Sequence, residues 1–432
     1  MISTGLAAWI VFPLFLLLLF SGTPIFIALL GVGGLGLFLF EGPRAFLMMN
    51  IKFFEPLWDF GWLAIPVYIW LGNVFFFSRM GEELYDAFNK WMGWLPGGLG
   101  IATTGSDAIF GVINGSSMAA CATIAPISYP AMRKAGYTEV IATGINASAG
   151  GLASMIPPSV NMIVYANLAL VSLGQLFFAG FIPGFLLALF FSAFLFVRGL
   201  LTPKSVPRGV SFSWKERIYS LKVIGPVAVI FLGIFGGIYA GIATPSEAGA
   251  IGCIFALILS IVKRKLSVAE FLESLVRTGR VSSMLFMIMA GGYVLNYFFF
   301  ISGLQDAVRT MILGWRAPGF VILLGMWVVL MFLGMILETS AMYMVTVPFF
   351  VPVVNALGIE PIAFGIIMIL AGEMAQITPP VGVNLFVINA VTGVPVMRVA
   401  RGAAPYVGIL WLMMVLIYFF PKIALWLPGK MW

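Results

Sequence analysis

The chain has 432 residues, of which 62% are hydrophobic and 9% are charged, with a formal net charge of +7 and no histidine. This composition excludes an ordinary soluble domain and predicts an integral membrane protein within a lipid bilayer. Histidine is the commonest general base and metal ligand, so its absence favours a protein that is not an enzyme and holds no cofactor. The excess of Lys and Arg is interpreted as a signal for membrane orientation and not as a nucleic-acid-binding surface.

Apolar runs of about 20 residues predict a series of spanning helices. In chain order, the first half gives spans near residues 5–21, 24–40 and 60–78, a Gly/Ser-rich interrupted segment at 97–131, a broken helix at 139–171 and a span at 176–197. A polar connector at 198–222 follows, and the second half gives spans at 223–241, 244–262 and 281–301, an interrupted segment at 318–354, a broken helix at 360–392 and a span at 403–420. The first run lacks a basic start and a cleavage site, so we expect a retained helix and not a signal peptide.

The two halves repeat each other at an offset of 222 residues. Over the 103 positions from Gly81 to Pro183, chance should place a matching Gly or Pro 222 residues later at roughly two positions. Eleven match without a gap: Gly81/Gly303, Pro96/Pro318, Gly97/Gly319, Pro126/Pro348, Pro130/Pro352, Gly136/Gly358, Gly150/Gly372, Pro157/Pro379, Pro158/Pro380, Gly180/Gly402 and Pro183/Pro405. The sequence therefore predicts two copies of one helical unit.

The interrupted segments are predicted to be re-entrant hairpins, which enter and leave the membrane on one side. Each copy then has five spans, including its broken helix, and the odd number inverts the second copy relative to the first. With the connector in the cytoplasm, 17 of the 23 Lys and Arg lie inside, in agreement with the positive-inside rule. Both termini are then expected in the periplasm.

Four interruptions of the helices coincide with polar residues. Bare backbone survives at membrane depth only inside protein or beside a water-filled cavity, and broken helices of this kind form the binding sites of transporters. Free carbonyls suit a sodium ion, whereas helix N-termini and hydroxyls suit an anion. The predicted ion-binding residues, at two sites where a hairpin tip meets a broken helix, are Asn114, Gly115, Gly150, Pro157, Ser159, Glu338, Gly372, Glu373, Thr378, Pro379 and Gly382. The predicted substrate-binding residues are Ser116, Ser117, Asn161, Thr339, Ser340 and Asn384.

Several of these residues, and two further acidic residues, also have a purely structural interpretation. The double prolines either form the site or only kink packed helices. Asp107, Glu247, Glu338 and Glu373 are ionisable groups in apolar sequence, which often mark ion or substrate paths. Glu247 follows Thr244 and could instead stabilise a helix start, and Asp107 could do the same. Asn161 and Asn384 either orient a ligand or tie two helices together.

Five motifs resemble the large membrane subunit of TRAP (tripartite ATP-independent periplasmic) transporters. They are Gly115-Ser116-Ser117, Arg133-Lys134-Ala135-Gly136-Tyr137, Ile156-Pro157-Pro158-Ser159, the segment 243–250 (ATPSEAGA) and the segment 377–386 (ITPPVGVNLF). The resemblance implies sodium-coupled import of a small organic anion, such as a dicarboxylate, sialic acid or another sugar acid, across the bacterial inner membrane. It also implies two partners, a small four-helix membrane subunit and a soluble periplasmic substrate-binding protein.

The resemblance further implies an elevator mechanism, in which a transport domain slides against a scaffold. The scaffold helices are then expected at 1–80 and 223–302, and the transport segments at 81–197 and 303–432, divided by the connector at 198–222. Glu373 departs from the small or apolar residue expected at its position.

Three other functions fit parts of the pattern. A stand-alone ion-coupled divalent-anion transporter shares inverted repeats and hairpins but needs no binding protein. A passive channel would conduct without sodium. A membrane enzyme acting on lipid or isoprenoid phosphates would need clustered acids or bases at one interface. The sequence has no Walker-type phosphate loop, so direct use of ATP is not expected.

Overall fold

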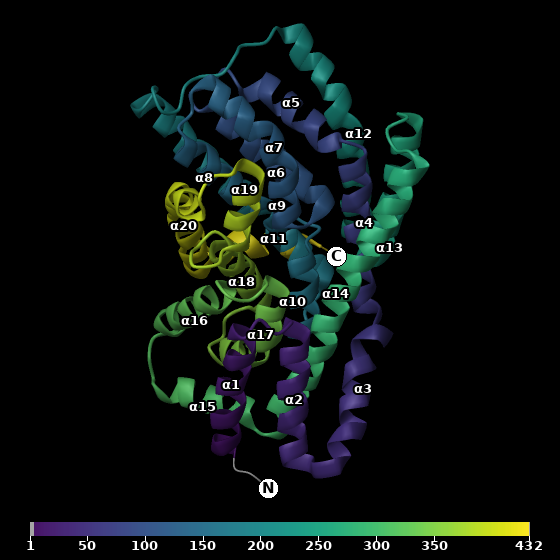
Figure 1. Cartoon of the computed structure of the whole chain (residues 1–432), viewed down its shortest axis with the longest axis vertical. Coiled ribbons are helices and arrows are strands. Elements are labelled where there is room, and N and C mark those ends of the chain that lie inside the picture. The colour runs from purple at the N-terminus through teal and green to yellow at the C-terminus, as the bar shows by residue number, and fades with distance from the viewer. Residues whose placement is uncertain (1–3, 432) are drawn as a thin grey trace.

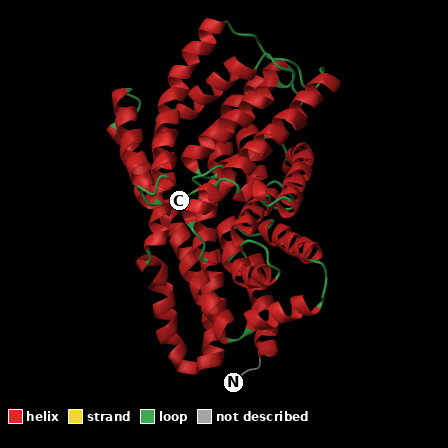
Figure 2. Ribbon diagram, turned by 180° about the vertical axis from the view of Figure 1, so that it is seen from behind, coloured by secondary structure: helices red, strands yellow, loops and turns green. Residues whose placement is uncertain are grey.

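The computed structural model describes residues 4–431, and every regular element in that range is helical (Figures 1 and 2). Residues 1–3 and 432, the extreme ends of the first and last predicted domains, lie outside the described part. The predicted all-helical fold is thereby confirmed for residues 4–431. The model has seven helical segments long and apolar enough to cross a membrane, or up to nine if each bent pair counts as one span.

The first copy runs from α1 to α11. Its helices are α1 (Thr4–Phe20), α2 (Ile25–Glu41), α3 (Ala45–Trp58), α4 (Ala64–Phe77), α5 (Met80–Met92), α6 (Gly98–Asn114), α7 (Ser117–Ala135), α8 (Glu139–Ala149), α9 (Leu152–Met155), α10 (Val160–Ala169) and α11 (Leu173–Leu201). Short 3-10 turns, Gly42–Arg44 and Phe60–Leu63, flank α3.

The second copy runs from α12 to the C-terminus. Its helices are α12 (Trp214–Tyr239), α13 (Pro245–Val262), α14 (Val268–Ile301), α15 (Leu304–Gly314), α16 (Gly319–Gly334), α17 (Thr339–Ala356), α18 (Pro361–Gln376), α19 (Val383–Thr392), α20 (Val396–Phe419) and α21 (Lys422–Leu425), followed by the 3-10 turn Pro428–Lys430.

Helix boundaries follow the offset seen in the sequence. The second helix of each hairpin begins at Ser117 and at Thr339, and the next helix begins at Glu139 and at Pro361, so both pairs of starts are 222 residues apart. The interrupted segments are helix pairs, α6–α7 and α16–α17, and the broken helices are α8–α9–α10 and α18–α19.

Local sequence explains several of these boundaries. Helices α12, α13 and α14 each begin with a capping box, in which a Ser or Thr and the Glu three residues later satisfy free backbone amides reciprocally. Helix α7 ends at Ala135 and is followed by the C-cap residue Gly136, whose φ of 98° belongs to the left-handed region that glycine adopts without a steric cost.

Three features differ from the expectation drawn from the sequence. Helices α3, α5 and α15 are additional elements, which the search for long apolar spans did not identify. The span expected at 281–301 is the second part of the 34-residue helix α14, which begins at Val268. The connector expected at 198–222 is helical at both ends, because α11 continues to Leu201 and α12 begins at Trp214.

The two hairpins approach each other from opposite halves of the molecule. Helices α5, α6 and α7 lie in the upper half of Figure 1, and α15, α16 and α17 lie in the lower half. Helix α14 crosses between the halves and packs against α2, α3 and α4 of the first copy and α17 of the second. The fold is therefore intertwined, and the hairpin tips meet near its middle.

Small residues allow the closest helix contacts. A Cβ atom on Gly33 of α2 would lie 2.7 Å from the Cα of Leu295 in α14, and one on Gly36 would lie 2.6 Å from the Phe298 ring. A Cβ on Gly402 of α20 would overlap the carbonyl oxygen of Val140 in α8. Such backbone approach is typical of helix pairs in membranes.

Candidate functional site

The first hairpin tip packs directly on the broken helix of its own copy. Gly115 has a φ of 64°, and its N–H donates to the carbonyl oxygen of Gly111, which ends α6. A Cβ on Gly115 would lie 2.5 Å from the carbonyl oxygen of Pro158, so only glycine fits this contact. The N–H of Val160, at the start of α10, donates to the Gly115 carbonyl oxygen at 3.4 Å.

The second hairpin tip is organised by a carboxylate. Glu338 is the N-cap residue of α17, and its Oε2 accepts hydrogen bonds from the backbone N–H groups of Ser340 at 2.8 Å and Ala341 at 3.4 Å. The Ser340 hydroxyl donates to Glu338 Oε1 at 3.2 Å. An acidic N-cap suits the positive end of the helix dipole.

The two broken helices interrupt at matched places. The axis of α8–α9 turns by 46° into α10, across Pro157 and Pro158. Ser159 caps α10 by accepting from the N–H of Met162 at 3.4 Å. In the second copy, residues 377–382 separate α18 from α19, and Gly382 has a φ of 53°. Each break leaves backbone groups that the helices themselves cannot pair.

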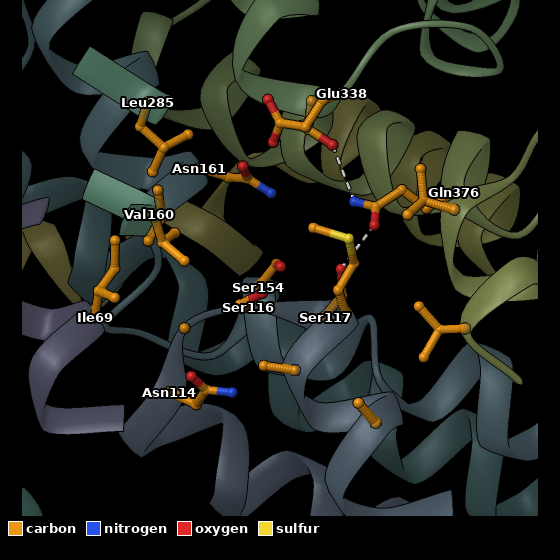
Figure 3. A pocket seen from close by; sticks show the side chains of 18 of the residues that line it. Ile69, Asn114, Ser116, Ser117, Ser154, Val160, Asn161, Leu285, Glu338 and Gln376 are labelled. Carbon is orange, nitrogen blue, oxygen red and sulfur yellow. Dashed lines mark hydrogen bonds between the residues drawn. The ribbon is translucent and has the colours of Figure 1, made fainter. Parts of the chain in front are cut away.

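Gln376, the last residue of α18, connects the two hairpin tips. Its Oε1 accepts from the Ser117 hydroxyl at 2.9 Å, and its Nε2 donates to Thr339 Oγ1 at 2.9 Å (Figure 3). The same Nε2 lies 3.3 Å from Glu373 Oε1, which also accepts from Asn161 Nδ2 at 3.4 Å. One amide therefore holds both tips to the second broken helix.

Equivalent positions of the two copies meet at this centre. Gly151 and Glu373 are 222 residues apart, and a Cβ on Gly151 would lie 3.1 Å from Glu373 Oε2. The first copy thus places a glycine where the second places a carboxylate. Glu373 is 2% exposed, and its Oε2 has no hydrogen-bond partner among residues 4–431.

A cavity of about 320 Å³ lies between the tips and the helices α4 and α14. Its size is within the range of small-molecule sites. Its polar walls come from the two tips, from Ser154, Asn161 and Gln376, from Asn73 of α4 and from Arg277 of α14, and its apolar walls include Ile69, Val160 and Leu285 (Figure 3). Among the described residues that line the cavity, Arg277 is the one basic side chain and Glu338 the one acidic side chain.

The structure brings seven of the predicted site residues to the cavity wall: Asn114, Gly115, Ser116, Ser117, Asn161, Glu338 and Thr339. The other ten do not line it: Gly150, Pro157, Ser159, Ser340, Gly372, Glu373, Thr378, Pro379, Gly382 and Asn384.

Several of these non-lining residues have identified contacts. A Cβ on Gly150 would lie 2.9 Å from the carbonyl oxygen of Ser117, and one on Gly372 would lie 2.9 Å from the methyl group of Thr339. Asn384 Nδ2 donates to the carbonyl oxygen of Ala147 at 3.4 Å and so ties α19 to α8.

The remaining ionisable residues separate into two kinds. Glu247 closes a capping box with Thr244, which is the structural interpretation given for it above. Asp107 is buried in α6, and neither of its carboxyl oxygens has a hydrogen-bond partner within residues 4–431.

Sequence reasoning missed four residues of the site. Gln376, Ser154 and Asn73 carry no charge and lie within apolar helices, so a search for ionisable groups passes over them. The repeat offers one signal for two of them, because Gln376 stands 222 residues after Ser154. Arg277 precedes the predicted span at 281–301 in the sequence and so falls among the cations expected outside the membrane, but α14 already includes it.

These features define a class: a helical membrane transport protein whose hairpins and interrupted helices surround one central cavity. A family model described as Tripartite ATP-independent periplasmic transporter, DctM component, matches residues 12–423. The chain belongs to this family and is a large permease subunit of the TRAP type, a multi-pass inner-membrane transport protein. The resemblance stated from the motifs is thereby confirmed.

Individual relatives agree with this assignment. The C4-dicarboxylate TRAP transporter large permease protein DctM of Pseudomonas aeruginosa is 32% identical over 401 residues, which are 93% of each chain. The sialic acid TRAP transporter large permease protein SiaM of Vibrio cholerae is 31% identical over 376 residues, 86% of each chain. The crystal structure of the Alcanivorax borkumensis YdaH transporter shares the fold, with a TM-score of 0.65 at 15% identity over 95% of this chain and 100% of that one.

Proposed function

We propose that the protein imports a small organic anion by sodium-coupled secondary transport, with the substrate delivered by a periplasmic binding protein. The observation that carries this proposal is that both hairpin tips line one cavity, that the first helix break packs on Gly115, and that Gln376, at the start of the second break, joins the tips. Interrupted helices at such a centre provide free carbonyls and helix N-termini side by side. The relatives that act on C4-dicarboxylates and sialic acid support an organic acid as substrate.

Sodium would bind where each tip meets its broken helix. The donor set fits a small hard cation, because it consists of backbone carbonyls, hydroxyls and carboxylate oxygens. In the first copy the carbonyls of Gly115, Gly150 and Pro157 would contribute. In the second copy Glu373 would contribute its Oε2, a buried oxygen without a hydrogen-bond partner among residues 4–431. The cation would supply positive charge beside the anionic substrate.

The substrate would bind to the polar groups that face the cavity. Ser116, Ser117, Asn161 and Thr339 offer hydroxyl and amide groups for hydrogen bonds to a carboxylate or a sugar hydroxyl. The cavity lies between these hairpin residues and α14, which belongs to the expected scaffold. This position supports an elevator mechanism, in which segments 81–197 and 303–432 carry the site past a scaffold formed by 1–80 and 223–302.

The topology and the partners complete the proposal. The basic connector lies in the cytoplasm, both termini lie in the periplasm and the second copy is inverted. The family's tripartite name supports assembly with a small membrane subunit and a substrate-binding protein.

The test is uptake into proteoliposomes that contain this chain, its small subunit and its cognate binding protein. Radiolabelled succinate and N-acetylneuraminate are the probes, each with an inward sodium gradient, with equal sodium on both sides, and without sodium. We expect accumulation only under the inward gradient. Equal uptake without sodium would remove the coupling, and full uptake without the binding protein would favour the stand-alone anion transporter.

A further inference from the structure

Arg277 is the basic residue of the described cavity wall, and it faces a single acidic residue of that wall, Glu338, without an ion pair between them. It lies on α14, and the cavity wall on this helix also includes Val281, Met284 and Leu285. Its guanidinium carbon is 4.5 Å from the centre of the Phe76 ring, a cation–π contact. Within residues 4–431, Arg277 takes part in no ion pair.

An ordinary ion-pair partner is available to Arg277 on its own helix. Glu273 precedes it by four residues, the spacing and order that favour a Glu–Arg pair on a helix surface. The structure does not form this pair; Glu273 is exposed, and the half-buried guanidinium lies over Phe76. A guanidinium that lines a polar cavity without pairing with the carboxylate four residues before it keeps its donors available for a ligand.

A second, more acidic hollow adjoins the cavity at Ala122. This adjoining hollow, of about 350 Å³, is lined by Phe76, Phe77, Arg79, Gly81, Glu82, Ala122, Thr123, Pro126, Ile127 and Glu270. Ala122 lines both hollows, and Phe76, whose ring contacts the Arg277 guanidinium, lines the second. The second hollow contains the carboxylates of Glu82 and Glu270 and one guanidinium, Arg79. Its net negative charge should repel an anion, so an anion is favoured in the first cavity, where Arg277 lies.

We propose that Arg277 forms an anion subsite, which binds a carboxylate of the substrate from the wall opposite the hairpin tips. This proposal rests on the proposed function and deepens it. The tips would hold the polar remainder of the molecule, while the guanidinium forms a charge-assisted, bidentate contact with one carboxylate. Since α14 is an expected scaffold helix, the subsite would form only in the position of the transport segments seen here.

The first test measures the charge preference of the cavity without any substrate. Ala122→Cys provides a reporter thiol at the junction of the two hollows, and the unmodified chain provides the background because Cys121 and Cys253 are buried. The probes are an anionic and a cationic methanethiosulfonate of similar size. Arg277→Gln should lower the anionic-to-cationic rate ratio about tenfold, as expected for the loss of a focused positive charge.

Two matched variants define the control. Arg277→Lys should preserve most of the ratio, because it keeps the positive charge. Arg280→Gln removes an exposed cation three residues along α14 that does not line the cavity, and it should leave the ratio unchanged. A ratio that Arg277→Gln does not alter would overturn the anion subsite, whatever the protein transports.

The second test measures transport by the complete complex in proteoliposomes. With succinate or N-acetylneuraminate as the probe, Arg277→Gln should raise KM about tenfold or more while the dependence on sodium stays intact. Arg277→Lys should lie in between, because it retains charge but not the bidentate geometry. An unchanged KM would refute the subsite. Failure of the wild-type complex to transport either acid would count against the proposed function. The ratio of anionic to cationic reaction rates at Ala122→Cys would still show whether Arg277 forms an anion subsite.

Discussion

Replacing Gln376 by leucine should loosen the contact between the two hairpin tips. The substitution conserves most of the side-chain volume but removes three hydrogen-bond contacts, to Ser117, Thr339 and Glu373. Side-chain hydrogen bonds between membrane helices average about 0.6 kcal/mol, so the loss is about 2 kcal/mol. A change of that size multiplies the population of a locally opened state about 30-fold.

The assay uses a buried thiol as the reporter of opening. Ala341 follows the second tip and is 0% exposed, so Ala341→Cys should react slowly with a small maleimide in the otherwise wild-type chain. Gln376→Leu should raise that rate about 30-fold, whereas Gln175→Leu, at a half-exposed glutamine outside the cavity, should not alter it. A labelling rate that stays within twofold of the parent would refute the view that Gln376 holds the tips together.

Three further outcomes are expected. Gly402→Ala should lower the free energy of unfolding, measured by thermal unfolding in detergent, by about 2 kcal/mol, because the new methyl group meets the backbone of α8. Gly408→Ala on the same helix is the control: its new methyl group would have no atom within 4 Å, so the free energy of unfolding should stay unchanged. Ser117→Ala and Thr339→Val should each weaken uptake severalfold without reducing the amount of protein in the membrane, and unchanged uptake kinetics would remove both hydroxyls from the site. Thr244→Ala should destabilise the start of α13 by about 1 kcal/mol, seen as faster hydrogen exchange of its first-turn amides; unaltered exchange would contradict the capping role.

The breaks in the helices could be read from the sequence because glycine and proline act locally. A proline lacks the backbone donor a helix needs, so the ends of α8–α9 and α18 follow from residues such as Pro157 and Pro379. The hairpin turns follow in the same way from Gly115 and from the polar group at Glu338. The amphipathic helices α5 and α15 do not, because the search was for long apolar runs and both mix apolar with charged residues. Helix α3 is mainly apolar, but Asn50, Lys52 and Glu55 interrupt the run within 14 residues.

The contacts across the site depend on how the copies pack and are not encoded in local patterns. Gln376 lies in a helix that is otherwise almost wholly apolar, and nothing near it in the sequence indicates that its partners are 37 and 259 residues away. Asn161 and Asn384 look alike as polar residues after a double proline. The structure separates them, because the first lines the cavity and the second bonds to α8.

The pairing of α2 with α14 has a consequence for biosynthesis. The glycine face of α2 at Gly33 is completed by Leu295, which the ribosome reaches 262 residues later. At usual rates of translation that interval is roughly 10–50 s. During this time the glycine face of α2 lies in the membrane without its partner α14. The insertion machinery or the lipid must therefore cover this face until α14 has been synthesised.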